Sequence, residues 1–178
     1  MVKINFYGGP GSGKSTVAAL LFSELKVHGF RTELVREAAK DKVYQGMDLR
    51  DSGVDLQLVI FAEQLSRELL VEKQVDFIVS DSPLFLNAHY ANQPFLTEVA
   101  KRRNSKKDFH VWVERDANEH FENEGRSHTE SQSRKIDQKM KDFLQKECGL
   151  ELIILKGTAK EKSSFIVNKI IRNQKRKK

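Results

Sequence analysis

Residues 8–15 read Gly-Gly-Pro-Gly-Ser-Gly-Lys-Ser, and this stretch constrains the fold more than any other part of the chain. It fits the pattern G-x-x-x-x-G-K-[ST], the P-loop, in which backbone N–H groups and a helix N-terminus bind a phosphate. A β-prone run precedes it at residues 2–7, and residues 16–25 read as a helix. The alternative is a glycine-rich turn in an ordinary strand-to-helix unit. The phosphate-binding loop is favoured because the stretch contains four glycines and the Lys-Ser pair. The expected strand and helix also lie directly before and after it.

The pattern also predicts what the individual residues of the loop do. Lys14 is expected to reach the β- and γ-phosphates of a nucleotide, and the Ser15 hydroxyl to ligate Mg²⁺. The glycines let the backbone approach the phosphates closely. The residues expected to contact the nucleotide are Gly8, Gly9, Pro10, Gly11, Ser12, Gly13, Lys14, Ser15 and Thr16.

Length and composition favour one soluble domain. The 178 residues are expected to form a single unit, residues 1–178, with 39% hydrophobic and 31% charged residues. No apolar run approaches the length of a bilayer span, so no membrane partner is expected. A strand begins at residue 2, which leaves no room for a signal peptide. Cys148 is the only cysteine, and an internal disulfide is therefore impossible. These features predict a reducing, cytoplasmic location.

The formal net charge of +6 favours polyanionic partners, which include both nucleotides and nucleic acids. Basic residues cluster at residues 101–107 and in a C-terminal tail at 172–178. A solvated helix end and a frayed terminus would explain these clusters. A nucleic-acid partner is the alternative that they keep open.

Strand and helix signals alternate along the chain without a long linker, which predicts a three-layer α/β domain with a mainly parallel sheet. One helix, at residues 54–72, has an apolar repeat at helical spacing that is expected to face the core: Val54, Leu58, Phe61, Leu65 and Leu69. The strands are expected at residues 2–7, 31–35, 76–81, 109–113 and 150–155, and the other helices at 14–28, 37–44, 84–103 with a break near 93–94, from about 129, and at 159–171.

Asp81 ends the buried strand expected at residues 76–81. Ligands of parallel sheets bind beyond the carboxyl ends of the strands. Asp81 is therefore a candidate to hold Mg²⁺ or to accept a proton from an acceptor hydroxyl. The structural alternative is a cap for the next helix, since Asp-Ser-Pro is also a helix-start sequence. A motor ATPase would usually carry Glu at the next position, where this chain has Ser82.

Three further positions are candidates for the acceptor side. Glu37 follows the second strand and could bind or deprotonate an acceptor hydroxyl, although a first-turn Glu that stabilises a helix N-terminus is an equal alternative. Gln64 shares a helix face with Gln57, and its amide could read a base edge or a carboxamide, if it is not merely surface. Tyr90 could stack on an acceptor ring, but core packing is the simpler interpretation.

The polar stretch at residues 119–134 carries one glycine and is expected to form a small closing lid. Arg126 and Arg134 would stabilise the charge that spreads over a transferring phosphoryl group. Arg115, just after the fourth strand, could join them. An ordinary surface loop with ordinary arginines is the alternative.

Taken in order, these features resemble the nucleoside and nucleoside-monophosphate kinase branch of P-loop proteins. They are similar, more narrowly, to the AAA-domain group typified by the nicotinamide riboside kinase domain of the NAD-salvage regulator, many of whose members are phage-encoded. The matching stretches span most of the chain and are GGPGSGKST (8–16), VREAAKD (35–41), QLVIFAEQ (57–64), SDSPLFLNAHYA (80–91) and GRSHTESQSRKID (125–137).

The resemblance implies a P-loop NTPase fold with a five-stranded parallel sheet in the order 2-3-1-4-5 and a small lid. It implies ATP as the phosphoryl donor and a nucleoside, nucleotide or nucleotide-like acceptor bound between Glu37, Gln64 and Asp81. Gly157 and Thr158 resemble the turn that contacts adenine in such kinases. The expected function is therefore an ATP- and Mg²⁺-dependent kinase, in the host cytoplasm if the chain is phage-encoded.

Two other functions stay open. A relative in this group acts on hydroxymethylated bases of viral DNA, so the acceptor hydroxyl could belong to DNA or RNA. Ser82 in place of Arg also departs from the deoxynucleoside kinase pattern. The third possibility is a nucleotide-dependent ATPase switch. Residues 158–161, Thr-Ala-Lys-Glu, lack the Asp of the guanine-reading N-K-x-D motif, which disfavours a GTPase.

Overall fold

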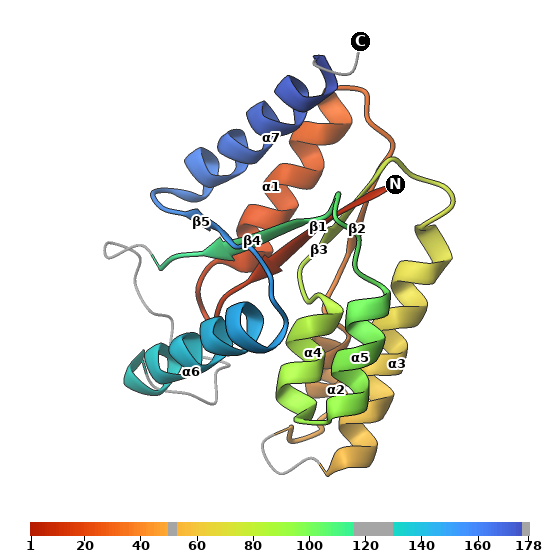
Figure 1. Ribbon diagram of the computed structural model, residues 1–178, viewed down its shortest axis with the longest axis vertical. Coiled ribbons are helices and arrows are strands. Elements are labelled where there is room, and N and C mark those ends of the chain that lie inside the picture. The colour runs from red at the N-terminus through yellow and green to blue at the C-terminus, as the bar shows by residue number, and fades with distance from the viewer. Residues whose placement is uncertain (50–52, 116–129, 176–178) are drawn as a thin grey trace.

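The computed structural model describes residues 1–49, 53–115 and 130–175, and its centre is a five-stranded parallel sheet (Figure 1). The strand order is β2-β3-β1-β4-β5, as predicted. Every neighbouring pair is parallel, so all the strands begin at one edge of the sheet and end at the other. The strands are β1 (Val2–Tyr7), β2 (Thr32–Val35), β3 (Phe77–Ser80), β4 (Phe109–Val113) and β5 (Ile153–Leu155).

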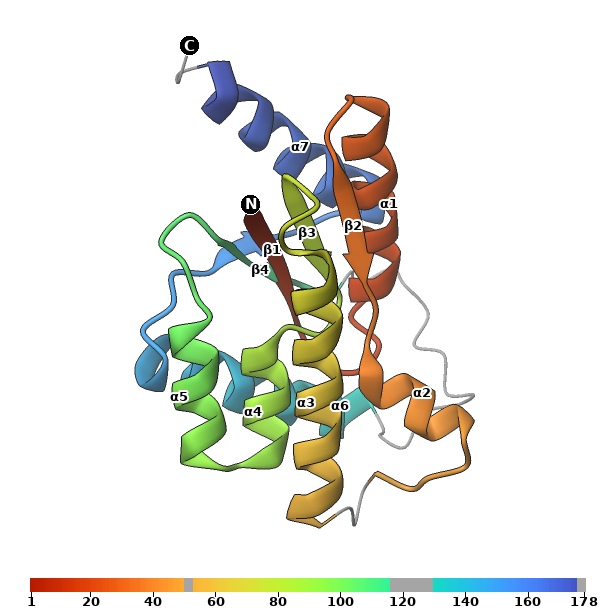
Figure 2. The same cartoon turned by 90° about the vertical axis from the view of Figure 1, so that its right-hand side faces the viewer.

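Helices cover both faces of this sheet, which confirms the three-layer class (Figures 1 and 2). The break expected near residues 93–94 separates two helices, because Asn92 is left-handed at φ 49° and Pro94 begins the second helix. None of the described helices is both long enough and apolar enough to cross a bilayer. The helices are α1 (Lys14–Val27), α2 (Ala38–Tyr44), α3 (Val54–Val71), α4 (Leu84–Ala91), α5 (Pro94–Arg102), α6 (Glu130–Asp142) with the π-helical turn η1 (Phe143–Glu147), and α7 (Ala159–Lys175).

The apolar core lies mainly between the sheet and the pair α1 and α7. Successive side chains of a strand point to opposite faces, so Ile4 and Phe6 of β1 face this pair of helices. They pack there with Leu21 of α1 and Ile166 of α7, all fully buried. A second cluster joins Trp112 and other residues of the opposite face to α3, α4, α5 and α6.

The side of α3 that faces the sheet differs from the expected apolar stripe. Phe61 is buried and Leu65 packs on the second core cluster, as predicted. Gln64 and Glu68 are buried in place of the remaining apolar positions. On this buried face Glu68 pairs with Lys3 of β1. The expected core positions that are instead exposed are Val54, Leu58 and Leu69.

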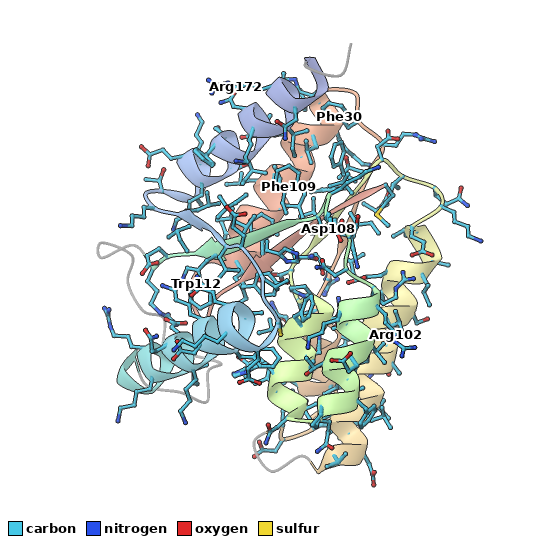
Figure 3. All side chains as sticks on the ribbon, viewed as in Figure 1. Phe30, Arg102, Asp108, Phe109, Trp112 and Arg172 are labelled. Atoms are coloured by element: carbon cyan, nitrogen blue, oxygen red, sulfur yellow. The ribbon has the colours of Figure 1, made fainter. Side chains whose placement is uncertain are left out.

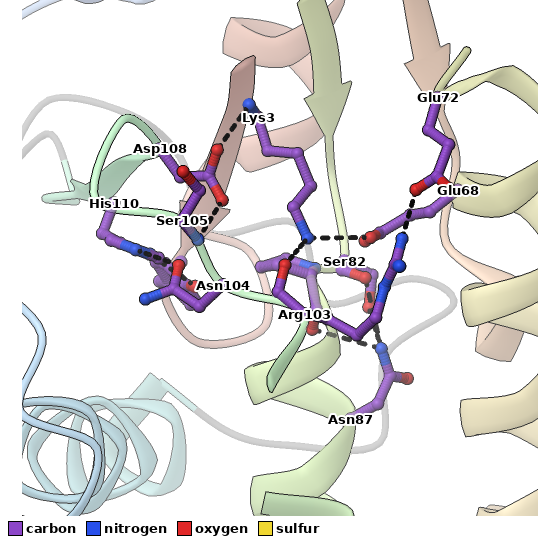
Figure 4. Close-up of polar contacts among 12 residues, drawn as sticks. Lys3, Glu68, Glu72, Ser82, Asn87, Arg103, Asn104, Ser105, Asp108 and His110 are labelled. Atoms are coloured by element: carbon purple, nitrogen blue, oxygen red, sulfur yellow. Dashed lines mark hydrogen bonds and ion pairs between the residues drawn. The ribbon is translucent and has the colours of Figure 1, made fainter. Parts of the chain in front are cut away.

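A network of polar side chains fixes the start of β1 against α3 and the turn before β4 (Figure 4). The ammonium of Lys3 lies 3.2 Å from Glu68 Oε2 and donates a 2.8 Å hydrogen bond to the carbonyl oxygen of Arg103. Arg103 pairs in turn with Glu72. Asp108 accepts a 2.9 Å hydrogen bond from the backbone N–H of Lys3. The buried charge of Lys3 is thus paired and hydrogen-bonded, which burial of a charge requires.

His110 is a buried titratable group on the same face of the sheet. Its Nδ1 lies 3.0 Å from the Tyr7 hydroxyl, and its Nε2 lies 2.9 Å from Asn104 Oδ1. Burial lowers the pKa of His110 to about 4 and raises that of Tyr7. Asp108 favours the charged imidazole and Lys3 disfavours it, but burial is the larger effect.

We expect the free energy of unfolding to fall as the pH drops from 6.5 towards 4. His110 has an ordinary pKa of 6.5 when unfolded and about 4 when folded, so acid protonates the unfolded chain first. The stabilisation from the neutral His110 is fully present above pH 6.5. Once the histidine is protonated in both states, the free energy of unfolding is lower by about 3 kcal/mol. Urea titrations at several pH values measure it. His110→Gln should flatten this slope, and the exposed His28→Gln should leave it; an unchanged slope in His110→Gln would contradict the assignment.

Candidate active site

The loop between β1 and α1 has the conformation that its glycines predict. Gly11 and Gly13 adopt the left-handed φ values 78° and 82°, which favour glycine. The N–H of Ser12 bonds to the carbonyl of Gly9 at 3.2 Å, and α1 begins at Lys14. The loop thus lies at the carboxyl end of β1 with a helix N-terminus beside it, an arrangement suited to binding phosphate.

The ammonium of Lys14 lies over the loop. It donates hydrogen bonds to the carbonyl oxygens of Gly8 at 2.8 Å and Gly9 at 3.1 Å. Burial lowers the pKa of Lys14, and the negative charges of Glu37 and Asp81 oppose that shift. The lysine expected to bind the donor phosphates is therefore within electrostatic reach of both carboxylates expected on the acceptor side.

Asp81 follows β3 directly, at the carboxyl edge of the sheet. Its backbone N–H donates to the carbonyl of Val35, the last residue of β2, at 3.1 Å. The residue is 8% exposed, and Oδ1 has no hydrogen-bond partner in the described part of the chain. The alternative role as a helix cap does not hold, because Pro83 occupies the capping position of α4 and no side chain caps it. A buried carboxylate oxygen without a partner among these residues is free to accept a hydrogen bond from water or a hydroxyl, or to bind a hydrated cation.

Glu37 occupies the capping position before α2, at the carboxyl end of β2. Its side chain makes no capping hydrogen bond to that helix. Burial raises the pKa of Glu37, Lys14 lowers it, and Asp81 raises it further. The carboxylate is therefore within electrostatic reach of Lys14 and Asp81, and its pKa is raised, the direction that favours a proton acceptor.

Gln64 of α3 contacts the backbone next to Glu37. Its side-chain oxygen accepts a 2.9 Å hydrogen bond from the backbone N–H of Ala38, next to Glu37. The residue is fully buried, and its Nε2 has no partner among the described residues. Gln64 therefore holds the first turn of α2, and only its amide nitrogen is left to meet an acceptor. The sequence predicted the helix face that carries Gln64 but not this contact with α2.

An ion pair that the sequence did not predict lies against the loop. Asp137 of α6 accepts a 2.6 Å hydrogen bond from the Gly9 N–H, and Arg115 donates to Asp137 at 2.8 Å through Nε. Asp137 ends the stretch 125–137, yet nothing in its local pattern distinguishes it from a surface residue of a helix. Arg115 was considered only for its place after β4.

The remaining predicted residues fall into two groups. Arg126 and most of the expected lid lie outside the described residues, while Arg134 is exposed on α6, three residues before Asp137.

Thr158 and Glu161 form a capping box at the start of α7, in which the Thr158 N–H donates to Glu161 Oε2 at 2.8 Å. Gly157 precedes it in a left-handed conformation at φ 91°. An adenine contact at this turn stays a prediction.

Tyr90 of α4 is not a core residue. Its side chain is 45% exposed, whereas Phe85 on the same helix is buried. The negative charges of Glu37 and Asp137 act on its phenol. Its aromatic ring is therefore close enough to these carboxylates that it could stack on a planar acceptor.

The described parts of the two basic clusters lie away from Lys14, Glu37 and Asp81. Residues 103–108 form the turn that enters β4, at the edge of the sheet where the strands begin. Arg172 lies near the C-terminal end of α7, towards the same edge (Figure 3). The P-loop lies at the opposite edge. Residues 176–178 of the basic tail are outside the described residues.

Comparison with known proteins agrees with the fold. Residues 3–162 match the family model described as an AAA domain. A thymidylate kinase from Ehrlichia chaffeensis has a similar structure, with a TM-score of 0.62 at 16% identity, over 97% of this chain and 98% of that one. An APS kinase from Mycobacterium tuberculosis aligns over 94% of both chains at 15% identity, with a TM-score of 0.49, too distant to add to the comparison. No curated protein matches the chain. The likeness to the thymidylate kinase establishes the three-layer fold.

Proposed function

We propose, because the chain belongs to the AAA domain family, that its P-loop serves an ATP- and Mg²⁺-dependent kinase. The acceptor would be a nucleoside, a nucleotide or a nucleotide-like molecule. The observation that carries the proposal is the convergence of Lys14, Glu37 and Asp81 at the carboxyl edge of the sheet. A loop that only binds a nucleotide has no need of two carboxylates beside the lysine that meets the donor phosphates.

The donor side would work by position and charge. The loop amides and Lys14 would hold the β- and γ-phosphates. Ser15 and Asp81 fit a hydrated Mg²⁺, since Ser15 is at the N-terminus of α1 and Asp81 has a buried oxygen without a partner. They would hold the ion, which neutralises the charge of the phosphate oxygens.

The acceptor side would activate a hydroxyl. The acceptor oxygen forms a bond to the γ-phosphorus, the bond to the β–γ bridging oxygen breaks, and ADP leaves. The hydroxyl proton passes to a carboxylate. Glu37 suits that task because its pKa is raised by burial, and Asp81 is the second candidate. Arg115, beside the loop, would stabilise the transferring group, together with Arg134 and Arg126 as the resemblance implies.

A free acceptor fits the placement of charge better than a polynucleotide. The basic clusters at residues 101–107 and 172–178 would be the main contacts for a nucleic acid, but residues 101–107 and Arg172 lie towards the edge opposite the P-loop. Part of their charge is also paired within the protein, as Lys101 with Glu98 and Arg103 with Glu72. A polynucleotide acceptor would give binding that weakens steeply with salt.

The test is a screen of labelled ATP against nucleosides, nucleoside monophosphates, nicotinamide riboside and DNA with hydroxymethylated bases. Label transferred to one class identifies the acceptor. Transfer to DNA alone, lost with rising salt, would favour the polynucleotide alternative. ATP hydrolysis that no acceptor changes would favour the ATPase switch and overturn the kinase.

Glu37→Gln is expected to lower kcat by about 10²- to 10³-fold if Glu37 takes the proton. In the wild type, kcat should fall as the pH drops through the raised pKa of Glu37, above its ordinary value of 4.5, because the protonated acid cannot accept a proton. Glu33→Gln is the matched control, since Glu33 lies on β2 and pairs with Lys26 at the surface. An unchanged kcat in Glu37→Gln would assign the proton to Asp81 instead.

A further inference from the structure

A carboxylate uses one of the amide donors of the phosphate-binding loop. The Gly9 N–H donates to Asp137 Oδ1 at 2.6 Å, although the two residues are 128 positions apart. The N–H groups of such a loop bind anionic oxygens, and here the anionic oxygen belongs to the protein. Gly9 is among the residues expected to contact the nucleotide, so Asp137 bonds to an N–H that a phosphate would use if that expectation holds.

The same carboxylate orients Arg115. The guanidinium donates to Asp137 Oδ2 through Nε at 2.8 Å and to Oδ1 through Nη2 at 3.4 Å, and the two side chains are 13% and 18% exposed. The side chains of Asp137 and Arg115 both lie against the loop backbone. A Cβ added to Gly9 would lie 2.2 Å from Asp137 Oδ1 and 2.9 Å from Arg115 Nη2. A larger residue at this position would therefore have to displace the side chains of Asp137 and Arg115.

We propose that Asp137 is a positioning residue of the donor site, which holds Arg115 against the P-loop and competes with the nucleotide phosphate for the Gly9 amide. The inference rests on the proposed function. A carboxylate and a phosphate cannot share one N–H without strong repulsion, because each carries a negative charge at the same donor. The phosphate takes the N–H, and Asp137 keeps Arg115 through Nε, so that the guanidinium faces the transferring group.

Asp137→Asn separates these two effects. The amide keeps the size of the side chain but loses its charge, so ATP should bind about fivefold more tightly, because a charge-assisted contact that competes with the phosphate is lost. The kcat should fall about tenfold, because Arg115 is held less firmly. Titration with a fluorescent ATP analogue measures the affinity without any acceptor, and steady-state assays measure kcat. A purely structural role would move neither in this direction.

Asp142→Asn is the matched control, because Asp142 ends the same helix and pairs at the surface with Lys146. It should leave both quantities unchanged. If Asp137→Asn does not fold, the neutral pair Arg115→Gln with Asp137→Asn serves for the same titration and should also bind ATP more tightly than Arg115→Gln alone. Unchanged or weaker ATP binding in the folded variant overturns the inference. A wild type that binds no ATP would overturn the proposed function as well, whereas binding that depends on Lys14 but not on Asp137 overturns the inference alone.

Discussion

Lys14→Ala is expected to lower kcat for phosphoryl transfer by about 10²- to 10³-fold, the loss that follows removal of a charged group aimed at a transition state. The reason lies in the position of its ammonium, which the carbonyls of Gly8 and Gly9 hold over the loop. No other described lysine has this position, and the nearby carboxylates cannot replace a cation. The KM for ATP should rise too, because the same ammonium binds the ground-state phosphates.

Lys26→Ala provides the comparison. Lys26 lies in the last turn of the same helix, α1, and its ammonium pairs at the surface with Glu33 at 3.6 Å. The same side-chain truncation should leave kcat and KM near their wild-type values, since exposed pairs contribute little. Thermal melts of both variants check that they are folded. Transfer that survives in Lys14→Ala would mean that the P-loop does not hold the donor.

The fold could be predicted because its signals are local. The P-loop requires a strand before it and a helix after it, and the alternation of apolar strands with amphipathic helices gives the layers. The rotation of α3 could not be predicted in this way. Its apolar positions Leu58 and Leu69 are exposed, while its buried face carries Glu68, which pairs with Lys3, 65 positions away in the sequence. Periodicity within a helix carries no information about a charge on a distant strand.

The candidate site was also predictable only where local signals sufficed, and not where it depends on contacts between distant residues. Glu37 and Asp81 could be predicted because parallel strands end at one edge, which brings residues after β2 and β3 together. Gln64 was expected to contact the acceptor, but its oxygen bonds to Ala38. Asp137 was missed because its contact with Gly9 depends on where α6 packs. The acceptor, the likeness to the nicotinamide riboside kinase domain and a phage origin stay predictions.

Asp81→Asn is the substitution that most directly tests the role of the carboxyl edge of the sheet. We expect it to lower kcat by about 10³-fold. The carboxylate has a buried oxygen without a partner among the described residues, and a neutral amide there binds a cation more weakly and cannot take a proton. ATP binding measured without Mg²⁺ should persist or become tighter, because one negative charge near the phosphates is gone. The dependence of ATP affinity on Mg²⁺ should weaken.

Asp76→Asn is the matched control, because it removes the same charge at the other end of β3. It tests whether the effect depends on the position of Asp81. Asp76 pairs with Arg31 at 2.7 Å near the start of β3, at the edge opposite the P-loop. If the carboxyl edge alone performs the transfer, Asp76→Asn keeps wild-type kcat and Mg²⁺ dependence while Asp81→Asn loses both. Equal losses in the two variants would trace the effect to stability of β3 and remove Asp81 from the mechanism. Loss of kcat with unchanged Mg²⁺ dependence would instead make Asp81 the proton acceptor, which leaves Glu37 to bind the acceptor hydroxyl.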